Sequence, residues 1–255
     1  MDNNDFANSL IKHERKHEEV RRNKYSNKII GQPELDESKL TRYIRPVVVN
    51  TRPAEFVNSN IISFELYNSF NYSLFLGDGK NTIRCSLGIT SPNTGEGKTT
   101  SACNLAAALA MGSNRKTVLV DLNFTKPVVH EIFGITNGPG LSDALLGEEI
   151  FVTPTQIENL SVMSSGLNKI IPVKRFSFFN EIATSLLHEF EFMIVDMPSV
   201  NTRSFPTLIA NQLTGLIIVV EARRTKRRDV DRIFRHVNER SVLGFVMNKI
   251  SESDF

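Results

Sequence analysis

The sequence predicts an α/β fold in which a doubly wound, mostly parallel sheet carries helices on both faces. Six short apolar runs have the length of buried strands, and segments of helical length separate most of them. This alternation is typical of parallel sheets covered on both sides, and such sheets bind ligands at the carboxyl ends of their strands. The predicted strands span 83–90, 117–121, 160–164, 192–196, 215–220 and 242–248.

The first part of the chain, residues 1–58, is predicted to form an N-terminal helix and an irregular arm. Residues 6–24 carry a thin apolar stripe among mixed charges, whereas the rest of this segment is polar, contains three prolines and shows no sustained periodicity. The domain proper is predicted to span 59–255. It begins with a helix that Asn60 could cap and that presents one apolar stripe to a core.

Two later helices are well defined by the sequence. A segment rich in alanine and leucine follows the first predicted strand after a short loop, and another helix is expected over 227–239. Val230, Ile233, Phe234 and Val237 follow the i, i+3, i+4, i+7 pattern there, which is the pattern of an amphipathic helix.

The composition limits the compartment and the classes of partner. The formal net charge of +2 does not predict nucleic acid as a partner. Cys85 and Cys103 fall in or beside apolar segments, which fits two reduced core residues better than a disulfide. The N-terminus shows no export signal, and the apolar runs are far shorter than the roughly 20 residues that cross a bilayer. We therefore expect a cytoplasmic protein without direct membrane insertion, which reaches a membrane only through a partner.

A glycine-rich loop between a predicted strand and a predicted helix is the strongest motif. Its glycines let backbone N–H groups form a concave nest, and the helix N-terminus adds partial positive charge, so the loop suits a triphosphate. Lys98 is expected to reach the outer phosphates and Thr99 to coordinate Mg²⁺. Pro92 stands where the standard motif has its first glycine, so this is a variant. The predicted nucleotide-binding residues of the loop are Thr94, Gly95, Glu96, Gly97, Lys98, Thr99 and Thr100.

Two aspartates are the predicted companions of this loop. Asp121 and Asp196 each end a buried predicted strand, so both are expected at the carboxyl edge of the sheet. A carboxylate in that place is suited to hold Mg²⁺ or a water bound to it. We therefore predict Lys98, Asp121 and Asp196 as catalytic residues, and Thr99, Asp121 and Asp196 as the metal ligands for Mg-ATP.

Several stretches together carry a resemblance to a known family. They are Thr90-Ser91-Pro92, the loop from Gly95 to Thr100, Val118 to Asp121, Lys126-Pro127, Phe133-Gly134, Gly140-Leu141-Ser142-Asp143, Asp196-Met197-Pro198 and Asn248. From about residue 60 to 250 the chain resembles the bacterial tyrosine autokinases of capsule and exopolysaccharide assembly, within the MinD/ParA-like class of P-loop NTPases. The N-terminal helix and Lys126-Pro127 look most like the subgroup linked to exosortase-type loci.

The resemblance implies a Mg-ATP-binding tyrosine autokinase that regulates the synthesis and export of an exopolysaccharide or capsule. It implies ATP at the loop, Mg²⁺ near Thr99, Asp121 and Asp196, and phosphoryl transfer to tyrosine. By position, Asn248 would contact adenine. The implied activating partner is the cytoplasmic segment of an inner-membrane, Wzz-like polysaccharide copolymerase, and the resemblance also implies self-association.

Three departures from the family pattern bear on catalysis and assembly. The family's second strand usually ends Asp-x-Asp-x-Arg, but here Asn123 replaces the second carboxylate, and an amide neither gives Mg²⁺ negative charge nor accepts the tyrosine proton. Asn68 and Asn71 replace both arginines of the Glu-x-x-Arg-x-x-Arg self-association helix that begins at Glu65. The usual tyrosine-rich tail is missing, because the four tyrosines all precede the loop. A catalytically weak or inactive ATP-binding regulator is therefore a second interpretation.

A positioning ATPase of the MinD/ParA type is a third interpretation. Such a protein would carry a signature lysine early in the loop, where this chain has Asn93.

The role of residues 223–228 also stays open, because five cations within six positions are equally consistent with a solvated surface and with a surface for phosphates, acidic lipid or an acidic partner. This basic cluster consists of Arg223, Arg224, Lys226, Arg227 and Arg228.

Overall fold

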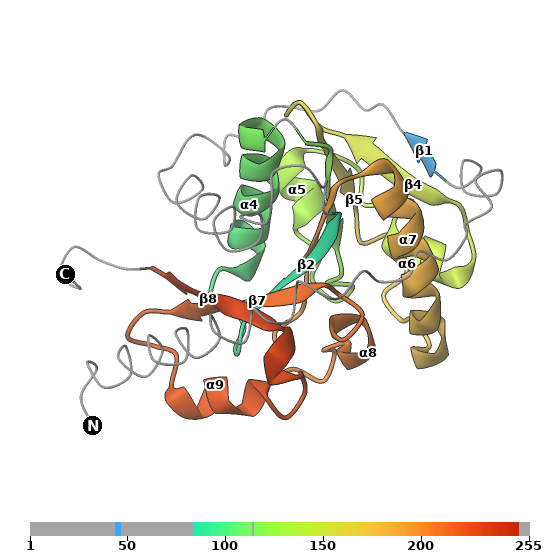
Figure 1. The fold of residues 1–255 in the computed structure, drawn as a ribbon. Coiled ribbons are helices and arrows are strands. Elements are labelled where there is room, and N and C mark those ends of the chain that lie inside the picture. Colours follow the sequence, from blue (N-terminus) through green and yellow to red (C-terminus); the bar gives the residue numbers. More distant parts are fainter. Residues whose placement is uncertain (1–43, 47–83, 114, 250–255) are drawn as a thin grey trace.

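The computed structural model describes residues 44–46, 84–113 and 115–249. Its strands are β1 (Ile44–Pro46), β2 (Cys85–Thr90), β3 (Thr117–Asp121), β4 (Ile150–Pro154), β5 (Leu160–Met163), β6 (Phe192–Asp196), β7 (Gly215–Glu221) and β8 (Val242–Asn248). They form one sheet in the order β1-β4-β5-β3-β6-β2-β7-β8 (Figure 1). Neighbouring strands are parallel except β4 and β5, which are antiparallel. The predicted α/β fold with a mostly parallel sheet is confirmed.

Helices cover both faces of this sheet. The described helices are α4 (Lys98–Ser113), α5 (Val129–Phe133), α6 (Leu141–Leu146), η2 (Val173–Phe178), α7 (Phe179–Glu189), α8 (Thr207–Ala210), α9 (Arg227–Ile233) and η3 (Glu239–Ser241). Successive strand residues point to opposite faces, so the core has two halves. Leu119 and Ile194 belong to the half that α4 and α5 cover, whereas Val120 and Val195 belong to the half that α6 and α7 cover (Figure 1).

The long helix α4 is built to lie close to the sheet. Ala102, Ala106 and Ala110 are buried, and their small side chains let the helix backbone approach the strands. Cys85 and Cys103 are buried free thiols in the same half of the core, as predicted. Because α4 begins directly after the glycine-rich loop, this packing fixes the position of the loop at the carboxyl edge of the sheet.

The six predicted strands are present, with ends that agree within a few residues. Sequence patterns did not predict β1 (Ile44–Pro46), which lies in the arm that was expected to be irregular. They also did not predict β4 (Ile150–Pro154), which is short, only partly buried and ends in proline, so its apolar signal is weak. The predicted helix over 227–239 is wrong in its second half, because α9 ends at Ile233. Val237 is nevertheless buried, so the periodic pattern marked burial beyond the point where helical geometry stops.

Most predictions for the first 83 residues fall outside the described residues. These are the helix over 6–24, the helix that begins at Asn60 and the self-association positions Glu65, Asn68 and Asn71. The proposed division at residue 58 falls there as well and stays a prediction. Within the described part of the chain, no helix combines the length and the apolarity that crossing a bilayer requires.

Candidate functional site

The glycine-rich loop joins β2 to α4 in a conformation that needs its glycines. Gly95 and Gly97 have φ angles of 87° and 96°, which lie in the left-handed region that side chains rarely adopt. A Cβ atom on Gly97 would also overlap the side-chain amide of Asn248. Thr94 and Gly95 are exposed at the tip of the loop, and Thr100 is half-buried in the first turn of α4.

Lys98 and Thr99 open helix α4 and face the sheet edge. Lys98 is buried, and its positive charge offsets part of the rise in pKa that burial causes in Asp121 and Asp196. The Thr99 hydroxyl donates a hydrogen bond of 2.7 Å to Oδ2 of Asp196. The structure therefore brings together four of the residues that the sequence predicts for the site.

Asp121 and Asp196 end neighbouring strands and lie directly opposite each other in the sheet register. Oδ1 of Asp121 accepts a hydrogen bond from the backbone N–H of Asn123 (2.9 Å), and its Oδ2 accepts one from that of Val129 (3.3 Å). In contrast, Oδ1 of Asp196 is buried and has no hydrogen-bond partner among the residues that the structure describes. Burial raises the pKa of both carboxyl groups, and the charge of Asp121 raises the pKa of Asp196 further.

This arrangement fits a divalent cation. Two buried carboxylates that face each other repel, and a buried oxygen without a hydrogen-bond partner destabilises the fold. A cation bound between them would reduce the repulsion and give that oxygen a partner. The described residues contain no group of three His, Cys, Asp or Glu that could hold a metal by itself. Mg²⁺, however, commonly takes one or two carboxylates and fills its other positions with phosphate oxygens and waters. Thr99, Asp121 and Asp196 could supply such an incomplete set of ligands.

Glu96 ties the loop to the rest of the molecule. Its carboxylate accepts hydrogen bonds from the backbone N–H of Asn93 (2.8 Å), from Nδ2 of Asn93 (3.1 Å) and from Oγ1 of Thr225 (2.6 Å). Thr225 lies between β7 and α9, and its hydroxyl also accepts from the backbone N–H of Glu221 (2.8 Å). Sequence reasoning placed Glu96 in the nucleotide site but missed Thr225. No local sequence signal identifies this partner, because 129 positions separate the two residues.

The end of β8 supports the loop from a second side. Nδ2 of Asn248 donates to the backbone carbonyl of Glu96 (3.0 Å), so this amide holds the loop. Nζ of Lys249 donates to the carbonyl of Gly95 (2.8 Å) and pairs with Glu221 (3.1 Å). The hydrogen bond from Lys249 lowers the pKa of Glu221. The contact of Asn248 with adenine stays a prediction, and Lys249 is a further residue of this site that sequence reasoning missed.

Asn123, the departure from the family pattern, stabilises the turn that follows β3. Its Oδ1 lies 3.3 Å from both the backbone nitrogen of Lys126 and Oγ1 of Thr125, and both donate to it. The side chain is half-buried, and its backbone N–H holds Asp121. The amide therefore lies beside the carboxylate pair without adding charge to it.

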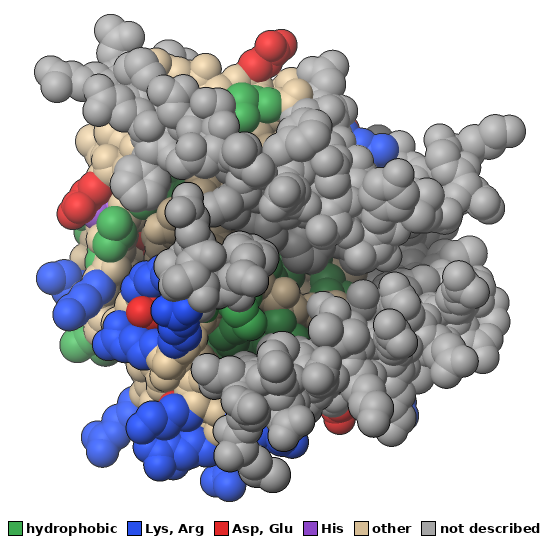
Figure 2. Space-filling model, turned by 90° about the vertical axis from the view of Figure 1, so that its left-hand side faces the viewer, with side chains coloured by type: hydrophobic (Ala, Val, Ile, Leu, Met, Phe, Trp, Pro, Cys, Tyr) green, Lys and Arg blue, Asp and Glu red, His purple; other side chains and the backbone are tan. Residues whose placement is uncertain are grey.

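The basic cluster at 223–228 lies next to this loop, because its Thr225 is the partner of Glu96. All five cationic residues are at least partly exposed. Arg224 pairs with Glu221 (3.3 Å) and Arg228 with Asp229 (3.8 Å), so acidic neighbours partly neutralise the cluster. Figure 2 views the molecule from the left-hand side of Figure 1, and Lys and Arg side chains gather in the lower part of that face. Whether the cluster is a solvated surface or a binding surface stays open.

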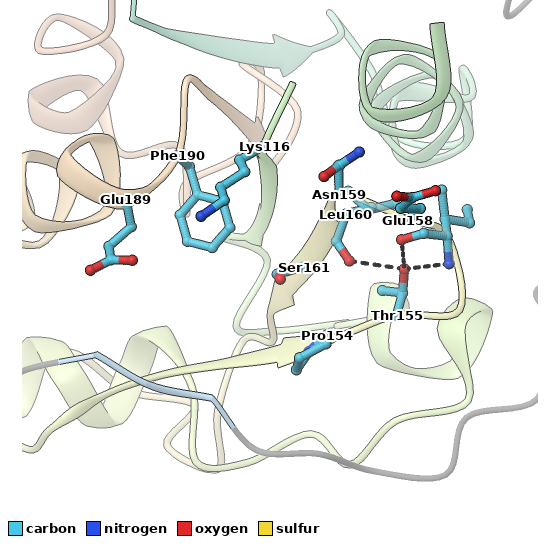
Figure 3. A pocket seen from close by; sticks show the side chains of 10 residues that line it. Lys116, Pro154, Thr155, Glu158, Asn159, Leu160, Ser161, Glu189 and Phe190 are labelled. Atoms are coloured by element: carbon cyan, nitrogen blue, oxygen red, sulfur yellow. Dashed lines mark hydrogen bonds between the residues drawn. The ribbon is translucent and has the colours of Figure 1, made fainter. Parts of the chain in front are cut away.

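A cavity of about 280 Å³ lies at the opposite edge of the sheet (Figure 3). Lys116 precedes β3, Phe190 precedes β6 and Leu160 begins β5, so the cavity is at the amino ends of these strands. Thr155, which follows the antiparallel β4, donates to the carbonyl of Leu160 (3.0 Å) and accepts from the backbone N–H of Ile157 (3.1 Å). The hydroxyl is thus used by the local turn, and the cavity is separate from the glycine-rich loop.

Comparisons with known proteins agree with this geometry. The ParA family model, described as "NUBPL iron-transfer P-loop NTPase", matches residues 82–252. The tyrosine-protein kinase CpsD of Streptococcus agalactiae is 30% identical over 74% of this chain and 83% of its own length. The putative tyrosine-protein kinase CapB of Staphylococcus aureus is 26% identical over 81% of this chain and 90% of its own length.

Solved structures give the same assignment. The crystal structure of the chimerical protein CapA2B2 is 27% identical, with a TM-score of 0.64 over 80% of this chain and 93% of that chain. The kinase domain of VpsO, at 24% identity and a TM-score of 0.63, covers 74% of this chain and 94% of that chain and shows the same fold. The P-loop fold implies that the chain binds a nucleotide. The chain belongs to the bacterial tyrosine-protein kinases within the ParA family of P-loop NTPases.

Proposed function

We propose that this protein is a Mg-ATP-binding, tyrosine-autokinase-like regulator of exopolysaccharide or capsule synthesis and export. One observation carries the nucleotide part of the proposal. The hydroxyl of Thr99, on the first turn after the glycine-rich loop, lies 2.7 Å from Asp196, whose strand neighbour is Asp121. A hydroxyl and two carboxylates behind a phosphate-binding loop form the ligand set expected for a magnesium ion that accompanies a triphosphate.

Each residue of the site has a separate role in this proposal. The loop N–H groups and Lys98 bind the phosphates, and Thr99, Asp121 and Asp196 hold Mg²⁺. The Thr99 hydroxyl donates a hydrogen bond to Asp196, so its oxygen keeps lone pairs for a cation. When bound, the ion neutralises charge on the phosphates that are transferred or cleaved.

The phosphoryl acceptor in this proposal is a tyrosine, which must lose its phenolic proton. Asn123 cannot accept that proton. Asp121 is the carboxylate nearest to it in the chain. We therefore assign proton acceptance to Asp121, with Lys98 and Asp196 as the other catalytic residues.

A catalytically weak or inactive regulator of the same machinery is the second candidate. The replacement of a carboxylate by Asn123, whose Oδ1 accepts hydrogen bonds within its own turn, favours it. This candidate needs nucleotide binding and the partner but no phosphotyrosine. In both candidates the partner is the cytoplasmic segment of a membrane copolymerase, as in the family that the sequence resembles.

Intact-mass analysis after incubation with Mg-ATP tests the two candidates. The samples are the wild-type chain, Lys98→Met and Asn123→Asp, each with its nucleotide affinity measured in parallel. Phosphate on tyrosine of the wild type, and none on Lys98→Met, supports the autokinase. Phosphate on Asn123→Asp alone supports the inactive regulator. Failure of the wild type to bind Mg-ATP at all would overturn both.

A further inference from the structure

The segment between β5 and α7 exposes large apolar side chains on the surface. Residues 166–178, which we call the apolar loop, include Leu167, Ile170, Val173 and Phe178, with exposed fractions of 72%, 87%, 69% and 40%. Only eight large apolar side chains are exposed among the residues that the structure describes, so half of them lie in this one segment. Single exposed apolar residues need no explanation, but a concentration of this kind marks an interaction surface.

The charges of the apolar loop all have one sign. Lys169, Lys174 and Arg175 alternate with the apolar residues, and no Asp or Glu occurs between 166 and 178. Lys169 and Lys174 are exposed, and the guanidinium of Arg175 lies 5.4 Å from the ring centre of Phe178. The loop therefore combines protruding apolar side chains with cations that no acidic residue of the loop offsets.

The loop is held firmly at both ends. At its start, the backbone N–H of Asn168 donates to Oγ of Ser142 (3.1 Å), and its Nδ2 donates to Oδ1 of Asp143 (2.7 Å). Near its end, Phe176 stacks on Phe124 with 6.4 Å between ring centres. Hydrogen bonds and ring packing thus fix the segment, and Ile170 and Val173, which lie between these anchors, face solvent.

The geometry points to the apolar loop as a docking surface for an anionic lipid bilayer. Side chains that protrude from one loop can enter the acyl boundary of a bilayer without a complementary groove, and the flanking cations meet the phosphates of the headgroups. Each cation near an anionic surface adds to this attraction. A protein partner would need shape complementarity to the same protrusion. This contact is peripheral, and it differs from our sequence-based expectation of membrane association only through a partner.

The apolar loop lies at the same edge of the sheet as the nucleotide site, so a membrane contact through it would also orient that site. Strand β5 runs parallel to β3, so the apolar loop starts at the same edge of the sheet as Asp121 and the glycine-rich loop. Docking through it therefore turns the nucleotide site toward the bilayer, on the side where a membrane partner would present its cytoplasmic segment. The contact itself does not depend on the proposed function, because it requires neither nucleotide nor catalysis.

Tryptophan fluorescence tests the contact directly, because the chain contains no tryptophan. Ile170→Trp places a single fluorophore at the most exposed apolar position of the loop. The matched control, Met111→Trp, lies near the end of α4 at the other edge of the sheet and is 57% exposed. With vesicles of equal parts phosphatidylcholine and phosphatidylglycerol, we expect the emission of Ile170→Trp to shift to shorter wavelength and that of Met111→Trp to stay unchanged. No shift for Ile170→Trp, or an equal shift for both, overturns the inference.

Vesicle flotation of the full chain gives an independent measure. We expect Ile170→Ser with Val173→Ser to weaken binding to the anionic vesicles at least about tenfold, because two apolar side chains no longer enter the bilayer. Lys169→Gln with Lys174→Gln should weaken it on the order of 25-fold, because each cation contributes a factor of about five.

A charge-matched control separates the loop from the basic cluster. Lys226→Gln with Arg227→Gln removes two charges from the cluster at 223–228, where both side chains are exposed, and should weaken binding less than Lys169→Gln with Lys174→Gln does. Equal melting temperatures would show that all variants stay folded. Absence of wild-type flotation, unchanged flotation of the loop variants, or loss confined to the cluster variant would each overturn the inference.

Discussion

The hydrogen bond between Thr225 and Glu96 should contribute measurably to both stability and nucleotide affinity. Thr225→Val keeps the size of the side chain but removes a donor to the buried carboxylate of Glu96 and an acceptor for the backbone N–H of Glu221. A hydrogen bond to a charged group contributes about 1.5–3 kcal/mol and a neutral one about 1 kcal/mol. We therefore expect Thr225→Val to lower the free energy of unfolding by about 2.5–4 kcal/mol.

The same substitution should weaken nucleotide binding, because it releases one tie of the glycine-rich loop. If the released loop adopts its binding conformation for a tenth of the time, the apparent Kd for Mg-ATP rises about tenfold. Urea denaturation and calorimetric titration measure the two effects. Thr225→Ser is the matched control, since it keeps the hydroxyl. Loss of affinity in Thr225→Ser equal to that in Thr225→Val, or no loss in Thr225→Val, would refute the reasoning that links the hydrogen bond to the loop.

Three further predictions concern the site and the core. Asp196→Asn should stabilise the unliganded protein at neutral pH. A carboxyl whose pKa is raised on folding loses its stabilising contribution as pH rises through the folded-state value, so the melting temperature of this variant should decline less with rising pH than that of the wild type. Titration should show that the variant no longer binds Mg-ATP. Gly97→Ala should abolish nucleotide binding, whereas Gly147→Ala, with a similarly positive φ of 106° but open space around it, should bind normally in the same titration. Phe133→Ala should destabilise the fold by about 3–5 kcal/mol in urea denaturation, because the ring is 2% exposed in the core.

For each of these three predictions, a specific result would contradict the reasoning. Greater pH sensitivity in Asp196→Asn than in the wild type would contradict repulsion between the buried carboxylates. If Gly147→Ala lost affinity as Gly97→Ala does, the positive φ angle rather than the overlap with Asn248 would explain the loss. A change below about 1 kcal/mol in Phe133→Ala would be typical of a surface position, not a core position.

The sequence predicted the parts of the site that depend on strand ends. Asp121 and Asp196 could be placed together because each ends an apolar run, and the carboxyl ends of parallel strands meet at one edge. The contacts of Thr225 and Lys249 could not be predicted in this way. They depend on turns in which Arg223 and Lys249 adopt positive φ angles of 61° and 57°, although neither is a glycine.

The burial of an apolar residue also does not follow from its secondary structure alone. Val237 lies outside a helix yet is buried, and Ile170 is apolar yet 87% exposed. A periodic pattern reports which residues avoid water on average, but it does not state which element covers them. The pattern therefore located most strands well, but it missed β1 and the weakly apolar β4 and did not indicate the exposed loop before α7.

The geometry of the site separates nucleotide binding from chemistry. The groups that hold Mg-ATP in our proposal depend on the sheet register and on the loop, and the loop is tied in place by Glu96 and Asn248. Asn123 lies beyond the strand, in a turn that its own amide stabilises. A substitution there changes the charge beside Asp121 without disturbing the register or the loop. A chain of this fold can therefore keep its nucleotide site while the rate of phosphoryl transfer varies through one side chain, so binding and phosphorylation need to be measured separately.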